Sequence, residues 1–250
     1  MTRQADRRLL TWQDRQVPTP RTLLFSCLAA LLALSGVTGV AHANGDDTDL
    51  ERHDPELLLG VVTKQQPVAP LDYAPDDLER VPGTDYELRA EVLEQLDLLF
   101  AAAEEEDLGL RVISGFRSYD TQAGTYDYWA RHYGRASADA TSARPGHSEH
   151  QTGLAVDLDN TTGTCYLDPC FGETKEGRWV AEHAHEFGFI LSYPQGARER
   201  TGYAYEPWHL RYVGPAVAGD MHTRGIALLP DYLGAPASSV RIGELLGSLG

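Results

Sequence analysis

Residues 146–157, which read GHSEHQTGLAVD, decide the fold and the chemistry of this chain. Large apolar residues alternate with smaller or acidic ones over 154–158, the pattern of a strand whose successive side chains point to opposite faces. Asp157 is then predicted to point away from the core and toward a cleft. Gly153 permits the tight turn that brings His150 back beside Asp157.

A second stretch, EPWHLRYVG at residues 206–214, places a carboxylate and an imidazole three positions apart. On an ideal strand Glu206 and His209 would face opposite ways. Pro207 lies between them and predicts a bend, because proline is confined to edges and irregular positions of strands. The bend would let both side chains face one site.

His150, Asp157 and His209 form a candidate metal site. Two imidazoles and one carboxylate are a donor set that zinc binds, with a fourth position left for water. Glu206 is then placed to accept a proton from that water, whose pKa the metal lowers. Because the chain holds nine histidines, the spacing alone also fits a chance arrangement.

Around these stretches, helical and strand-like segments alternate without a regular βαβ repeat, which favours an α+β fold. Apolar residues recur at helical spacing over 88–107, and a glycine follows at 109. The other expected helices are 119–133, 179–187 and 215–224; the expected strands are 110–114, 154–158, 189–193 and 205–213; and 137–148 is expected to be a loop.

The N-terminus has the pattern of an export signal. Five arginines precede the apolar run 23–40, and Ala41-His42-Ala43 then offers a cleavage site. We expect residues 1–43 to be a signal peptide that leads to the periplasm, the cell wall or the exterior. An uncleaved membrane anchor is the alternative, since the run is near the lower length limit for a span. The rest is expected to divide into an extended arm at 44–80, one folded domain at 81–235 and a tail at 236–250.

Charge and cysteine content narrow the function classes. Asp and Glu number 37 against 21 Lys and Arg, a formal net charge of −16, and such a surface repels nucleic acid. Cys165 and Cys170 are expected to form a disulfide in an oxidising compartment, with two free thiols as the alternative. A zinc knuckle is disfavoured because it would need a second cysteine pair.

Three motifs together resemble one enzyme family. SGFRS at 114–118, GHSEHQTGLAVD at 146–157 and EPWHLRYVG at 206–214 are similar, in order and spacing, to the motifs of the VanY-type D-alanyl-D-alanine carboxypeptidases, which include L,D-carboxypeptidases. The resemblance runs from about residue 57 to about residue 233. It implies a catalytic domain at 81–235 built on a small antiparallel sheet flanked by helices.

The resemblance also implies the chemistry. Carried over by position, it implies one Zn²⁺ per chain, held by His150, Asp157 and His209. Glu206 would act first as general base and then as general acid. The implied partners are peptidoglycan stem peptides, and a membrane is a partner only if the N-terminal segment is not cleaved.

Four further residues receive roles from the resemblance. Arg117 would stabilise the oxyanion, a task suited to a permanently charged fork of donors, although a structural salt bridge is the alternative. Ser148, Gln122 and Tyr193 stand where similar enzymes contact the terminal D-residue of the substrate and its carboxylate. Core packing is the alternative for Tyr193.

The function predicted from the sequence is therefore removal of terminal D-alanine from peptidoglycan stems, with D-Ala-D-Ala stems favoured. Three alternatives remain: an L,D-carboxypeptidase acting on tetrapeptide stems, an endopeptidase of the phage-lysin kind, and a wall-binding module without activity. The intact Glu206 and the complete set of metal-ligand candidates argue against the last. We expect a monomer.

Overall fold

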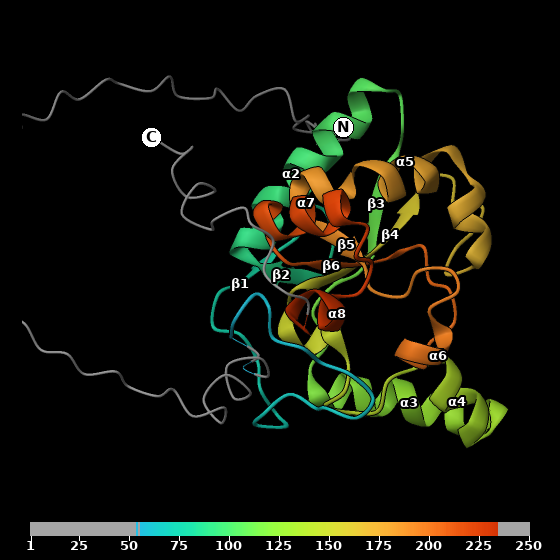
Figure 1. Ribbon diagram of the computed structural model, residues 1–250. Helices are drawn as coiled ribbons and strands as arrows, with labels where there is room; N and C mark the ends of the chain where they lie inside the picture. Colours follow the sequence, from blue (N-terminus) through green and yellow to red (C-terminus); the bar gives the residue numbers. More distant parts are fainter. Residues whose placement is uncertain (1–53, 55, 235–250) are drawn as a thin grey trace, which may run out of the picture. The chain divides into compact units, whose positions relative to one another are not determined.

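A four-stranded antiparallel sheet lies at the centre of the computed structural model, which describes residue 54 and residues 56–234 (Figure 1). The expected signal peptide at 1–43 and the expected tail at 236–250 lie outside the described residues. The strands follow the order β3 (Leu110–Ser114), β4 (Ala155–Asn160), β6 (His209–Tyr212) and β5 (Phe189–Leu191). Together with the surrounding helices, this sheet confirms the predicted α+β class.

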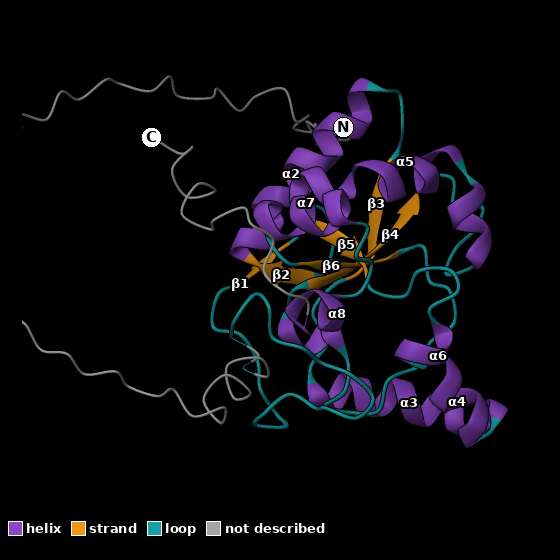
Figure 2. Cartoon of the chain, viewed as in Figure 1, coloured by secondary structure: helices purple, strands orange, loops and turns teal. Residues whose placement is uncertain are grey.

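Helices lie on both sides of the sheet. Figure 2 shows one group above it in this view and a second group below it. The upper group is α2 (Ala90–Glu105), α5 (Lys175–His183) and α7 (Pro215–Arg224), and the lower group includes α3 (Tyr119–Tyr133), α4 (Arg135–Thr141) and α6 (Arg198–Thr201). Among residues 56–234, no helix is long and apolar enough to cross a membrane.

The main core lies between the upper helices and the sheet. Helix α2 contributes an apolar stripe at helical spacing, as expected for a helix with one buried face. The strands contribute the alternate side chains of their inner face. Buried members include Val92, Leu96 and Leu99 of α2, Val180 of α5, and Val156, Leu158, Phe189 and Leu210 of the sheet. This packing fixes β4 and β6, the strands that carry Asp157 and His209.

The prediction of a loop at 137–148 is wrong for its first residues, 137–141. Helix α4 covers 135–141, directly after α3, from which Gly134 separates it. Three of its seven residues are alanine, the residue with the highest helix propensity. The small residues that suggested a loop therefore form a short helix.

Several element boundaries also differ from expectation: β5 ends two residues before the predicted 193, β4 is shifted toward 160, α2 is shorter than the predicted 88–107, and two further elements differ more. The helix predicted at 179–187 begins at Lys175, because the Thr174 side chain accepts a hydrogen bond from the Gly177 N–H and caps it. It then tightens into the 3-10 helix η4 (Ala184–Phe187). The strand predicted at 205–213 is reduced to β6, since Pro207 and Trp208 form a turn directly before it.

The arm is tied to the motif at 146–157. The amide nitrogen of Gln151 donates to the carbonyls of Leu71 and Tyr73 at 2.7 and 3.1 Å. His147 Nδ1 lies 2.9 Å from the Thr63 carbonyl oxygen. At the end of the arm, β1 (Leu78–Arg80) pairs antiparallel with β2 (Glu87–Arg89).

The predicted disulfide is present. The bond joins Cys165, in the loop after β4, to Cys170 of the 3-10 helix η3 (Pro169–Glu173). The described chain ends with α8 (Leu229–Gly234).

Candidate active site

The three metal-ligand candidates come together on neighbouring elements. His150 lies on the 3-10 helix η2 (Glu149–Thr152), which ends at Gly153 with a φ of 68°, a conformation that glycine adopts without strain. The register of β4 with β6 sets Asp157 opposite His209. All three side chains are buried, and one ligand atom from each lies within 4.8 Å of the others.

Hydrogen bonds orient both imidazoles. His150 Nδ1 lies 2.8 Å from the Gly115 carbonyl oxygen; because a carbonyl only accepts, Nδ1 carries the proton and Nε2 is left facing Asp157 at 3.2 Å. His209 has a carboxylate at each nitrogen: Asp157 Oδ1 lies 2.9 Å from Nδ1 and Glu149 Oε2 lies 2.9 Å from Nε2. Carbonyl or carboxylate acceptors behind a histidine are typical of metal sites.

Burial opposes charge on each of these side chains. For Asp157, burial alone would raise the pKa, but the interactions with His150 and His209 outweigh it and lower the pKa. For His150, burial prevails over the attraction of Asp157 and lowers the pKa. For His209, the hydrogen bonds to Asp157 and Glu149 outweigh burial and raise the pKa to about 10. A metal that binds here therefore displaces a proton from His209.

Glu206 lies on the turn that precedes β6. The His209 N–H donates to the Glu206 carbonyl at 3.2 Å, which confirms the bend expected at Pro207, and the Glu206 N–H donates to the Tyr193 carbonyl at 3.1 Å. Burial raises the pKa of Glu206 to about 7, with His209 opposing the shift and Asp157 adding to it. A carboxyl group with a pKa near neutrality is suited to take up and release a proton.

Arg117 follows β3 and is held by neutral groups. Its Nη1 donates to Gln122 Oε1 at 2.8 Å and its Nη2 to Ser114 Oγ at 3.0 Å. The Gln122 amide nitrogen donates in turn to the Ser142 hydroxyl and to the Ala143 carbonyl. Gln122 is fully buried, so the structure places it behind Arg117 with both ends of its amide engaged.

These groups open into one cleft of about 560 Å³. Its lining includes the three metal-ligand candidates together with Glu206, Arg117, Ser148 and Tyr193. The Tyr193 ring stacks on His209, with centroids 4.8 Å apart. The predicted site residues thus share one cavity, apart from Gln122, which supports Arg117 from behind.

Sequence reasoning missed the aromatic part of this cleft. Besides Tyr193, five aromatic side chains line it: Trp129, Tyr166, Tyr203, Tyr205 and Trp208. Trp129 lies on α3, Tyr166 lies in the loop after β4, and the other three lie in the stretch 203–208; only Trp208 lies inside a recognised motif. No spacing pattern in the sequence links the others to the site.

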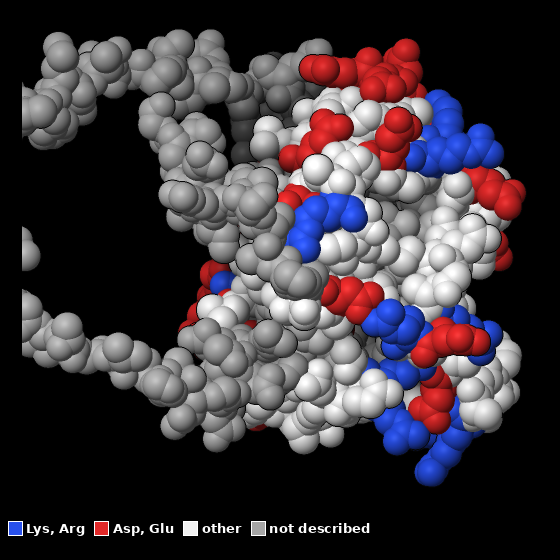
Figure 3. Space-filling view, viewed as in Figure 1, with Lys and Arg blue, Asp and Glu red and all other residues white. Residues whose placement is uncertain are grey.

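Charges on the face shown in Figure 3 are mixed. Basic and acidic side chains lie side by side in its lower part, over α3, α4 and α6. Arg131 of α3 pairs with Asp127 of the same helix, and Arg144 pairs with Asp139 of α4, each at 3.0 Å. Such pairs neutralise one another, whereas Arg117, with neutral partners in the cleft, keeps its charge available to an anionic ligand.

Comparison with known proteins identifies the family. The VanY family of D-alanyl-D-alanine carboxypeptidases matches residues 85–215, which include all three motifs. This chain belongs to that family.

Individual relatives agree with this assignment. The chain is 39% identical over 174 residues to the putative carboxypeptidase YodJ of Bacillus subtilis (strain 168), covering 66% of this chain and 63% of YodJ, less than two thirds of its length. The structure of the LdcB LD-carboxypeptidase is similar with a TM-score of 0.66 and 37% identity, over 72% of this chain and 87% of LdcB.

A structure of a vancomycin-resistance D,D-pentapeptidase VanY mutant, from a VanB-type cassette and in complex with Zn(II), is similar with a TM-score of 0.59 and 32% identity. This similarity covers 69% of this chain and 97% of that chain. Together with the family match, it confirms the expected zinc-peptidase fold.

Proposed function

We propose that this protein is a zinc-dependent carboxypeptidase that removes terminal D-alanine from peptidoglycan stem peptides. The observation that supports this most strongly is the buried set of His150, Asp157 and His209 in a cleft that Glu206 and Arg117 also line. Membership of the VanY family and the Zn(II) bound by the VanY structure support zinc as the metal.

The side chains present fit this metal. Two imidazole nitrogens and one carboxylate oxygen, all facing one cavity, are the donors of a catalytic zinc site with one position left open. Bound there, zinc supplies Lewis-acid activation of water and of the scissile carbonyl. Glu206 removes the proton from the attacking water and delivers it to the amine of the departing D-alanine as the C–N bond breaks.

Arg117 balances the negative charge that develops on the carbonyl oxygen during attack. Its guanidinium is already oriented by Gln122 and Ser114, so little reorganisation is needed when the charge appears. Ser148 and Tyr193 line the cleft and are placed to contact the terminal D-residue and its carboxylate. Gln122, for which the resemblance implied direct substrate contact, acts through Arg117.

The favoured substrate is a stem that ends in D-Ala-D-Ala, as in the family's description. An L,D-carboxypeptidase acting on tetrapeptide stems is the second candidate, and the similarity to LdcB supports it. An endopeptidase would share the metal site and differ in the position of the cleaved bond. The presence of Glu206 beside a complete set of metal-ligand candidates argues against a wall-binding module without activity.

We further propose that the protein acts outside the cytoplasm as a monomer. The N-terminal sequence pattern supports export, and the disulfide between Cys165 and Cys170 fits an oxidising compartment. Peptidoglycan stems are found in that same compartment.

Removing the metal is expected to abolish cleavage. Treatment with a chelator should stop D-alanine release from a synthetic pentapeptide stem, and one equivalent of zinc should restore it, because the Lewis acid is then back in place. Metal content is measured on the same samples by elemental mass spectrometry. Cleavage at the original rate by protein shown to be metal-free would contradict the proposal.

A further inference from the structure

Glu149 directly precedes His150 in the chain, yet its carboxylate reaches the other histidine of the site. Its Oε2 lies 2.9 Å from Nε2 of His209, while Nδ1 of the same ring lies 2.9 Å from Asp157 Oδ1. A neutral imidazole carries one proton and therefore donates from only one nitrogen. The acceptor that receives this proton decides which nitrogen remains free to bind a metal.

We propose that Glu149 is a positioning residue that accepts the Nε2–H of His209 and thereby presents Nδ1 to the metal. Nδ1 of His209 faces Asp157, and Asp157 in turn faces Nε2 of His150. With the His209 proton on Nε2, the free Nδ1 therefore lies close to the ligand atoms of the other two residues. A carboxylate behind a ligand histidine fixes the orientation of the ring and increases its basicity. The inference rests on the proposed role of His209 as a zinc ligand.

Arg211 holds Glu149 in place. It is fully buried, and its Nη1 lies 3.8 Å from Glu149 Oε1. The rest of its guanidinium donates to main-chain carbonyls: Nη2 to Leu58 and Gly60 at 3.0 and 2.9 Å, and Nε to Tyr212 at 3.1 Å. A cation fixed in this way provides a stationary counter-charge for the carboxylate.

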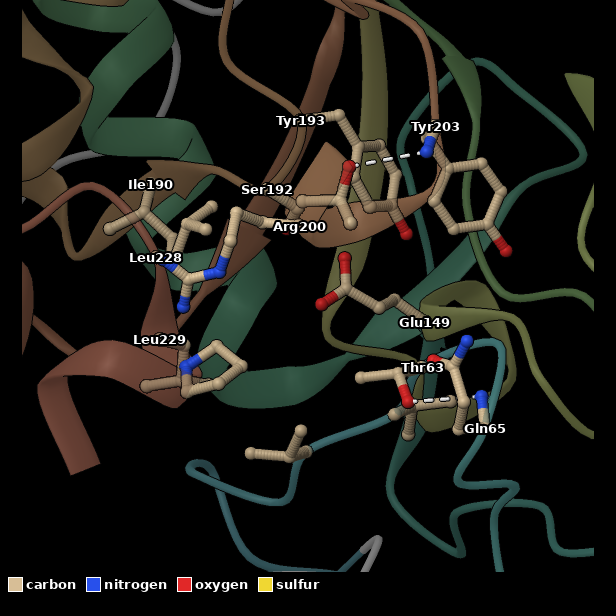
Figure 4. Close-up of a pocket in the computed structure, with 14 residues that line it drawn as sticks. Thr63, Gln65, Glu149, Ile190, Ser192, Tyr193, Arg200, Tyr203, Leu228 and Leu229 are labelled. Carbon is tan, nitrogen blue, oxygen red and sulfur yellow. Dashed lines mark hydrogen bonds between the residues drawn. The ribbon is translucent and has the colours of Figure 1, made fainter. Parts of the chain in front are cut away.

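The arm therefore takes part in the support of the metal site. A Cβ atom added to Gly60 would clash with the Asp54 carbonyl oxygen, so the chain is closely packed where it receives Arg211. Figure 4 shows Glu149 with Tyr193 on one side and Thr63 of the arm on the other, in a pocket that both residues line. The chain of contacts runs from the arm through Arg211 and Glu149 to His209.

The proposal is tested with Glu149→Gln. This variant keeps the side-chain size but removes the charge, and its amide nitrogen can donate to Nε2 and so favour a proton on Nδ1. Competition with a chromophoric chelator at constant pH should show zinc binding weakened by about 10- to 100-fold. Nitrogen NMR of the zinc-loaded wild type should show His209 protonated at Nε2.

Glu176→Gln is the matched control, because Glu149 and Glu176 are equally buried, each 8% exposed, and Glu176 lies on α5. Its zinc affinity should equal that of the wild type. Circular dichroism of the metal-free proteins checks that each variant folds; if Glu149→Gln does not, Glu149→Asp keeps the charge, withdraws the carboxylate by one methylene and should weaken zinc binding in the same direction.

Two results would overturn different parts of this account. Wild-type zinc affinity in a folded Glu149 variant, or His209 protonated at Nδ1 in the zinc-loaded wild type, would overturn the positioning role. Failure of the wild type itself to bind zinc would overturn the proposed function instead.

Discussion

Glu206→Gln is expected to lower the turnover number by at least about 100-fold, the effect of losing a general base. Gln has nearly the same size and cannot take up the proton of the attacking water. Burial raises the pKa of Glu206 to about 7, so the neutral amide should be accommodated without loss of structure. Steady-state release of D-alanine measures the effect, with bound zinc quantified in the same preparation.

Glu186→Gln is the control for this variant. Glu186 also contacts a histidine three residues away, His183, at 2.9 Å, but it is exposed and lies outside the cleft. Its turnover should match that of the wild type. Unchanged turnover in a folded, zinc-loaded Glu206→Gln protein would assign the proton transfer to another residue.

Arg117→Met is expected to reduce kcat/KM by about 100- to 1000-fold, the range seen when an oxyanion donor is removed. Methionine keeps much of the packing volume but offers neither charge nor hydrogen bonds. If Arg117 acts on the developing oxyanion, kcat itself should fall, whereas a role limited to substrate binding would raise KM alone. Initial rates over a range of stem concentrations separate the two.

Arg111→Met serves as the comparison for Arg117. Arg111 lies on β3 and pairs with Asp159 at 2.8 Å, toward the end of β4 distant from the motif turn. Activity in this variant should be retained. An Arg117→Met enzyme with normal kcat/KM would remove Arg117 from the mechanism.

Much of the site could be predicted because its determinants are local. The turn at Gly153, the alternation along 154–158 and the bend at Pro207 each depend on a few adjacent residues, and the sheet register then joins Asp157 to His209. Helices α3 and α7 likewise have the predicted bounds, since each is preceded and followed by clear start and stop signals.

The side-chain roles that the sequence did not predict depend on contacts between segments that are distant in the chain. Gln122 is paired with Arg117 and with residues some twenty positions later, and nothing local reveals that its amide is fully engaged. Glu149 and Arg211 lie inside the motifs, but their roles follow from an ion pair across the fold and from carbonyls of the arm. Helix α4 was missed because seven residues are too few for a periodic pattern to emerge.

The central claim is that the enzyme removes one terminal D-alanine and recognises the free carboxylate. Its most direct test is mass spectrometry of the zinc-loaded protein after incubation with a pentapeptide stem ending in D-Ala-D-Ala, its C-terminal amide and a tetrapeptide stem. The account predicts release of a single alanine from the free pentapeptide, with cleavage of the amide slower by about 10- to 100-fold because a charge-assisted hydrogen bond is lost. Equal cleavage of the amide and the acid, or release of dipeptides from the interior of the stem, would contradict it.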